Sequence, residues 1–123
     1  MQFAYNTYEK LKSRKLIKHL FEDGKAVTIF PLRLIYLKKD FDTKNPIKTS
    51  VSVSKRNFKL AVDRNRIKRL MREAYRLNKP FLYENVSNKY IFMFIYLGKE
   101  EIPLKKLNGK MKELISLFIK KSI

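Results

Sequence analysis

Residues 51–76 read VSVSKRNFKLAVDRNRIKRLMREAYR, and this stretch holds the two patterns that decide the fold. Its first residues alternate, with Val51 and Val53 on one side, as in a half-buried β-strand. Apolar residues in its second half recur at helical spacing. They are Ile67, Leu70, Met71, Ala74 and Tyr75. We therefore predict a strand over residues 49–55 and a helix over about residues 57–78.

The segments before this stretch predict one helix and two strands. Ser13 is a candidate N-cap and Gly24 a stop for a first helix, because apolar residues between them recur at helical spacing. Those residues are Leu16, Ile17, Leu20 and Phe21. Residues 26–38 are rich in β-branched and aromatic types, and Pro31 is expected to divide them into two strands. Turn-forming residues fill 40–46.

The segments after it predict one strand and one helix. Asn78 and Pro80 are expected to end the central helix. Residues 89–98, KYIFMFIYLG, predict a strand buried on both faces, in the middle of a sheet. A closing helix is marked by Leu107, Met111, Leu114, Ile115, Phe118 and Ile119. Residues 1–12 lack a clear period, and we expect an extended arm that packs on the domain.

The order α-β-β-β-α-β-α, without repeat or linker, predicts an α+β sandwich of one sheet with helices. A single domain is expected to cover residues 1–123. The N-terminus has no apolar export segment, and the longest apolar run, Ile91 to Leu97, is too short to span a bilayer. A cytoplasmic protein that does not enter the membrane is therefore expected. The absence of cysteine excludes disulfides and thiolate metal sites.

The charge of the chain predicts a polyanionic partner. Lys and Arg number 29 against 11 Asp and Glu, which gives a formal net charge of +18. The positive charges of such a chain repel one another unless a bound partner supplies negative charge. Nucleic acid is the expected partner, and an anionic membrane surface is the alternative. The alternative requires bulky apolar residues facing lipid, which the predicted strands do not favour.

The central helix concentrates this charge on one face. Between Lys55 and Lys79 there are ten basic residues and two acidic ones, Asp63 and Glu73. At about 100° per residue, six polar residues fall within an arc of roughly 140°, opposite the apolar face. They are Arg64, Asn65, Lys68, Arg69, Arg72 and Arg76. Guanidinium groups grip phosphate with two hydrogen bonds, so this face is predicted to bind the nucleic acid. A merely solvated face balanced by acids is the alternative, but acids are scarce here.

The residues VSK, AV and RNRIKRLMREAYR, in this order, resemble the signature of the bacterial ribonuclease P protein family. The resemblance covers most of the chain and is strongest over residues 51–76. It implies an α+β sandwich of the same element order, with a left-handed crossover between parallel strands. It also implies a non-catalytic subunit of an endoribonuclease, whose chemistry belongs to a catalytic RNA and its Mg²⁺. The residues implied to dock on that RNA are Arg64, Asn65, Arg66, Lys68, Arg69, Arg72 and, on the same face, Arg76.

The resemblance implies a second surface, a cleft between the first helix and the sheet that binds the 5′ leader of precursor tRNA. Phe21 and Tyr36 match the family's aromatic positions, and Lys55 and Arg56 would hold leader phosphates. Ile17 stands where the family commonly has a phenylalanine, so one stacking platform is missing. The loop RNFKLAV also replaces a shorter glycine-bearing turn. From the residues alone, Phe21 fits core packing equally well, and the strand face with Tyr36 fits a position under a helix.

No catalytic, metal-binding or cofactor-binding side chain is predicted. Asp40 and Asp42 form an Asp-x-Asp pair, but they lie in a turn-rich loop among lysines, where solvated acids are expected. His19 is assigned no chemistry, and no glycine-rich phosphate loop is present. No protein partner is predicted. The alternative function from another class is a structural RNA-binding protein, such as a ribosomal protein.

Overall fold

The computed structural model describes residues 10–40 and 46–122. These residues form three helices and four strands in the predicted order. The elements are α1 (Arg14–Asp23), β1 (Lys25–Ile29), β2 (Leu32–Lys38), β3 (Ile47–Val53), α2 (Ala61–Glu84), β4 (Tyr90–Tyr96) and α3 (Leu104–Ser122). The α+β class and the element order are therefore confirmed.

The four strands form one mixed sheet in the order β1-β2-β4-β3. β1 and β2 are the two halves of the segment that Pro31 divides, and they pair as an antiparallel hairpin. β4 pairs antiparallel with β2 and parallel with β3. It is thus an inner strand, and its apolar residues are buried on both faces, as its continuous hydrophobic run predicts.

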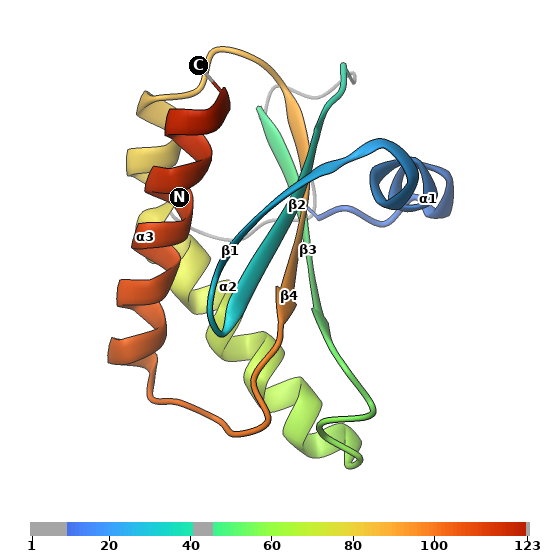
Figure 1. Ribbon diagram of the computed structural model, residues 1–123, viewed down its shortest axis with the longest axis vertical. Coiled ribbons are helices and arrows are strands. Elements are labelled where there is room, and N and C mark those ends of the chain that lie inside the picture. Colours follow the sequence, from blue (N-terminus) through green and yellow to red (C-terminus); the bar gives the residue numbers. More distant parts are fainter. Residues whose placement is uncertain (1–9, 41–45, 123) are drawn as a thin grey trace.

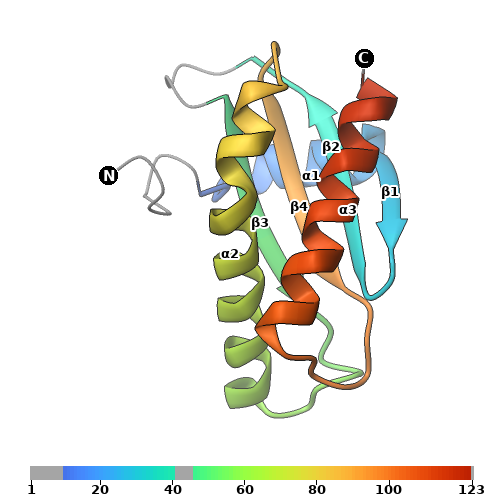
Figure 2. The ribbon, with the colours of Figure 1, turned by 90° about the vertical axis from the view of Figure 1, so that its left-hand side faces the viewer.

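The connection from β3 through α2 to β4 is a left-handed crossover. Figure 2 views the sheet from the side of α2 and α3, with β3 and β4 both running downward and β4 to the right of β3. A right-handed crossover would place β4 on the other side of β3. The hand implied by the family resemblance is therefore confirmed.

Helices cover both faces of the sheet, with α2 and α3 on one side and α1 on the other (Figure 1). Successive side chains of a strand point to opposite faces, so β4 contributes to two apolar cores. Phe92 and Phe94 belong to the larger core under α2 and α3. Ile91 and Met93 belong to a smaller core with Leu20 of α1. The sheet is thereby fixed between unequal helical layers.

The predicted end of the central helix is wrong. Helix α2 continues through Pro80 to Glu84. Proline removes one intrahelical hydrogen bond, but the following turn buries Leu82 and packs Tyr83 on the core. Asn78 does not cap the helix either. It is buried, and its Nδ2 donates to the carbonyl of Ala74 at 2.8 Å and to Oδ1 of Asn108 in α3 at 2.6 Å.

The helix also begins later than predicted, at Ala61 instead of about residue 57. Residues 54–60 form a turn and a short loop, in which the amide of Phe58 donates to the carbonyl of Ser54 at 3.1 Å. The N-cap residue, Leu60, has no side-chain oxygen that could cap the helix. Arg64 stabilises the loop from within the helix, since its Nη1 donates to the carbonyls of Phe58 and Lys59 at 2.8 and 2.9 Å.

The other predicted boundaries agree with the structure to within a few residues. Ser13 caps α1 by accepting from the amide of Leu16 at 3.3 Å, and Gly24 follows its last residue. β3 starts at Ile47, and α3 starts at Leu104. Of the predicted arm, residues 10–12 are described, and Leu11 is buried against the core beneath α1. The rest of the arm and most of the loop over 40–46 lie outside the described residues.

Candidate RNA interface

Four polar residues of the central helix face have no polar partner of their own. Asn65, Arg69 and Arg72 are exposed on α2, and Lys68 is half-buried. Within residues 10–40 and 46–122, none of the four makes a hydrogen bond or an ion pair. Met71, at the opposite side of the helix, is fully buried under the sheet. The helix therefore packs through one face and presents cations with unused donors on the other, as predicted.

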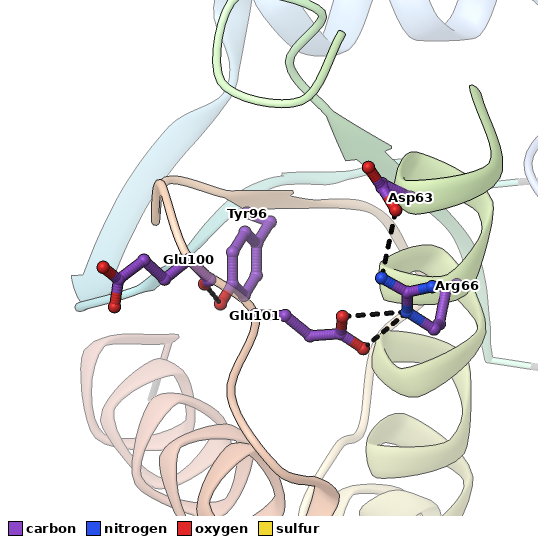
Figure 3. Close-up of polar contacts among 5 residues, drawn as sticks. All are labelled: Asp63, Arg66, Tyr96, Glu100 and Glu101. Atoms are coloured by element: carbon purple, nitrogen blue, oxygen red, sulfur yellow. Dashed lines mark hydrogen bonds and ion pairs between the residues drawn. The ribbon is translucent and has the colours of Figure 1, made fainter. Parts of the chain in front are cut away.

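Arg66 lies outside this arc and is held by acids (Figure 3). Its Nε donates to both carboxylate oxygens of Glu101, at 3.0 and 2.8 Å, and its Nη2 donates to Asp63 at 3.0 Å. The hydrogen bond to Glu101 is the main cause that raises the pKa of the Arg66 guanidinium. Glu101 follows β4 in a loop whose place is fixed by the Tyr96 hydroxyl, which donates to the carbonyl of Glu100. Arg66 thus links residues 64–66, here called the RNR segment, to the loop of residues 97–103.

Arg76 is also paired within the chain. Its Nη2 donates to Glu73 at 2.5 Å, and this hydrogen bond holds the pKa of the Glu73 carboxyl below its usual range. Arg64 is committed in part to the loop before the helix, as described above. The few acids near the helix therefore balance Arg66 and Arg76. The cations between them, Lys68, Arg69 and Arg72, remain unbalanced. The alternative interpretation of this helix face, a solvated face whose cations are balanced by acids, therefore applies to Arg66 and Arg76 only.

The basic surface extends from α2 around the edge of the sheet at β3. Arg72 lines a shallow pocket of about 190 Å³ together with Lys10, Lys12 and residues 49–51. The segment at Lys10 is held there by a parallel bridge to Thr49, and the amide of Leu11 donates to the carbonyl of Thr49 at 2.7 Å. Sequence reasoning missed these two lysines, because nothing in their local pattern shows that the arm lies against β3.

The sheet face beside α1 is the second surface. α1 packs on Ile91 and Met93 of β4 and leaves the face near Arg33 uncovered, where Arg33 is exposed and its Nε donates to Thr28 at 3.2 Å. Phe21 of α1 is 53% exposed, which removes the core-packing alternative for this ring. Ile17 instead packs against the small core under α1. The ring of Phe21 is therefore accessible on α1, and Arg33 places a cation on the uncovered part of the sheet face.

The position predicted for Tyr36 is wrong. Alternation along β2 places Tyr36 with Leu34 on the face under α3, opposite to α1. Its ring is 7% exposed and packs edge-on against Phe118 of α3, with the ring centres 4.8 Å apart. Burial raises the pKa of its phenol. Tyr36 is thus a core residue and does not belong to the cleft beside α1. On β2 it is Arg33 that lies exposed on the face beside α1, and sequence reasoning did not single it out.

Lys55 and Arg56 lie in the turn that follows β3 and are exposed. Neither side chain has a polar partner among the residues that the structure describes. Figure 1 shows this turn at the end of the sheet where α2 begins, whereas α1 crosses the other half. β3 is an edge strand and not the central one, so these cations continue the sheet edge toward the start of α2.

The remaining titratable residues do not converge on a site. Among the described residues, no three histidines or acids lie close enough together to hold a metal ion. His19 contacts Asp23 at 2.9 Å through Nε2, and its Nδ1 lies 3.4 Å from Nζ of Lys39. Asp42, half of the Asp-x-Asp pair, lies outside the described residues. No helix in the described part of the chain is long and apolar enough to cross a membrane.

Comparison with known proteins agrees with this geometry. A family model described as Ribonuclease P matches residues 5–118. The ribonuclease P protein component of Porphyromonas gingivalis is 40% identical over 103 residues, which cover 82% of this chain and 75% of that protein. The chain belongs to the ribonuclease P protein family. A second family member, from Chlorobium phaeobacteroides, is 43% identical over 79 residues, covering 62% of this chain and 54% of its own.

Solved structures of the family share the fold. The Staphylococcus aureus RNase P protein superposes with a TM-score of 0.72 at 17% identity, over 89% of this chain and 94% of that chain. The RNase P protein from Thermotoga maritima superposes with a TM-score of 0.71 at 21% identity, over 89% of this chain and 96% of that chain. Family membership makes this chain a protein subunit of an endoribonuclease with ribonuclease P RNA as its partner. A ribosomal or other structural RNA-binding protein is not favoured.

Proposed function

We propose that this subunit docks on the catalytic RNA through the middle of α2 and guides the 5′ leader of precursor tRNA across the sheet face beside α1. The observation that carries the first part is the set of unbalanced cations Lys68, Arg69 and Arg72, beside Asn65. Their donors are free to take phosphate oxygens, and Asn65 offers an amide for a base edge or a ribose hydroxyl. Arg64 and Arg66 flank this contact and bond the loops beside the start of the helix. Arg76 flanks it on the other side, paired with Glu73 of the same helix.

The leader surface is supported by the open sheet face. Phe21 offers an exposed ring, and stacking on aromatic rings tolerates any base, as an unpaired leader of variable sequence requires. Arg33 offers a cation on the same face, and Lys55 and Arg56 offer two more beyond the end of β3. Ile17 supplies an apolar floor in place of a second ring.

The chemistry is proposed to belong to the RNA. Hydrolysis of a phosphodiester needs metal ions or a general base positioned at the reacting phosphate. In the described part of this chain, no three histidines or acids lie close enough together to hold a metal ion at such a phosphate. Mg²⁺ held by the RNA would activate the attacking water, while the subunit neutralises phosphates and orients the substrate.

Cleavage of a precursor tRNA tests this proposal. A bacterial ribonuclease P RNA is assayed at low Mg²⁺, alone and with the wild-type protein. We expect the protein to stimulate cleavage at the mature 5′ end, and Arg69→Ala/Arg72→Ala to lose most of this stimulation. The matched control, Lys112→Ala/Lys120→Ala, removes the same charge from exposed positions of α3. Equal stimulation by both double variants would contradict docking through α2.

A further inference from the structure

We propose that the pocket formed by the β1–β2 turn, the loop of residues 97–103 and the first turns of α3 binds one unpaired nucleotide of the ribonuclease P RNA. The proposal rests on the docking of α2 described above and adds a contact apart from both α2 and the sheet face beside α1. The base would stack on Phe30, and lysines at the rim would hold the flanking phosphates.

The pocket has the size and lining for a nucleobase. Its volume is about 570 Å³, within the range of sites that hold small organic ligands. Phe30 lines it from the β1–β2 turn and is 66% exposed, more than any other large apolar side chain in the described part of the chain. Pro31, Leu97 and Ile102 contribute apolar surface. An aromatic ring left in water beside an apolar hollow offers a stacking surface that the fold itself does not use.

The charge of the rim selects a phosphate-bearing ligand. Lys99, Lys106 and Lys110 line the pocket against a single acid, Glu100. Lys110 is paired with Glu113 at 3.8 Å, whereas Lys99 and Lys106 have no polar partner among the residues the structure describes. A ring for a base together with ammonium groups for phosphates is the combination by which proteins hold unpaired RNA. An uncharged ligand would make no use of these lysines.

The pocket is also within reach of RNA that lies on α2. The loop that lines it carries Glu101, which bonds Arg66 of α2, and Glu100, whose carbonyl accepts from the Tyr96 hydroxyl (Figure 3). One short loop therefore separates residues 64–66 from the pocket, and hydrogen bonds from Arg66, Tyr96 and Asn57 hold that loop in place. An RNA strand that leaves α2 beside Arg66 would reach the pocket next.

Binding and cross-linking of the reconstituted complex test the proposal. Ribonuclease P RNA with 4-thiouridine in place of uridine is assembled with the protein and irradiated, and the linked peptides are identified by mass spectrometry. We expect a cross-link on the peptide that contains Phe30. Phe30→Ala should raise the Kd for the RNA about five- to a hundred-fold, the range set by loss of one stacked base.

Matched variants make the outcome specific. Phe81→Ala removes another exposed ring, on α2 and outside the pocket, and should change Kd by no more than about twofold. Lys106→Ala should weaken binding more than Lys105→Ala, because the two lysines are neighbours on α3 and only Lys106 lines the pocket. Circular dichroism checks that each variant folds, which is expected for these exposed positions.

Each failure has a distinct meaning. If Phe30→Ala binds like wild type and no cross-link forms, while Arg69→Ala/Arg72→Ala binds weakly, the pocket proposal is overturned and docking through α2 stands. If neither variant weakens binding, docking through α2 fails as well. If Phe30→Ala weakens only the complex that contains precursor tRNA, the nucleotide comes from the substrate, and the assignment to ribonuclease P RNA is overturned.

Discussion

Arg66 of α2 shares two hydrogen bonds with the carboxylate of Glu101, a residue 35 positions later in the chain, at 3.0 and 2.8 Å. This pair keeps one cation of the RNR segment partly neutralised. Glu101→Gln should therefore raise RNA affinity at low salt and steepen the dependence of log K on log salt by up to about one unit, because one more cation can displace a counterion. Filter binding over a salt series measures the slope. Glu113→Gln on α3 is the control, and an unchanged slope for Glu101→Gln would mean that Arg66 takes no part in binding.

Removing unpaired cations from α2 should make the salt dependence of RNA binding shallower. Each phosphate contact contributes roughly 0.7 to 0.9 to the salt slope, so Arg69→Ala/Arg72→Ala should reduce it by between roughly 1.4 and 1.8. The same salt series measures this loss. A fall in affinity with no change of slope would show that the two arginines act through the fold and not through phosphates.

How far the fold follows from sequence depends on how local the signal is. Period and turn chemistry placed every element, because β-strand alternation and helical spacing are properties of neighbouring residues. The end of α2 was mispredicted because Pro80 is a local signal for termination, whereas burial of Leu82 and Tyr83 is a tertiary effect that outweighs it. The left-handed crossover came from family resemblance, since periodicity carries no information on hand.

The candidate site shows the same division. The face of α2 was predictable from an angular plot, but the partners of Arg64 and Arg66 were not, because both come from loops. Leu70, predicted among the buried residues, lies half-buried at the border of the apolar face. Tyr36 was placed on the wrong face because a strand shows which residues alternate, not which side each helix covers.

The exposed ring of Phe21 leads to a test of leader binding. In the holoenzyme, Phe21→Ala should weaken binding of a precursor tRNA about five- to a hundred-fold while leaving mature tRNA, which has no leader, unaffected. Tyr36→Phe should bind both like wild type, since its phenol lies on the other face of the sheet. Equal losses for precursor and mature tRNA in Phe21→Ala would assign the ring to another contact.

The buried face of α2 predicts a large loss of stability on truncation. Met71 is fully buried, and Met71→Ala should lower the free energy of unfolding by about 2 to 5 kcal/mol. Leu77, on the same helix, is 46% exposed, and Leu77→Ala should change it by no more than about 0.5 kcal/mol. Urea denaturation measures both. Similar midpoints for the two variants would contradict this orientation of α2.

The raised phenol pKa of Tyr96 predicts that the free energy of unfolding falls at alkaline pH. Burial is the main cause that raises the pKa of its phenol above the ordinary value of 10.0, and the charge of Glu101 adds to it. The unfolded chain then loses this proton before the folded one, so the stabilisation is full below about pH 10 and is lost as pH rises through the folded pKa. Tyr96→Phe should therefore show a shallower alkaline loss of stability than wild type. Parallel curves in urea denaturation at a series of pH values would contradict this assignment.

The inner position of β4 has a consequence for the order of events during synthesis. Among the four described strands, β3 pairs with β4 alone, and the hairpin of β1 and β2 joins the sheet through β4. Helix α1 rests on Ile91 and Met93 of the same strand. β4 is also the last of the described strands in the order of synthesis. The residues before β4 therefore cannot complete the four-stranded sheet until residue 96 has been made, and nascent chains halted before that point should stay open to proteases. The sheet of this subunit therefore closes only when β4 is in place between β2 and β3.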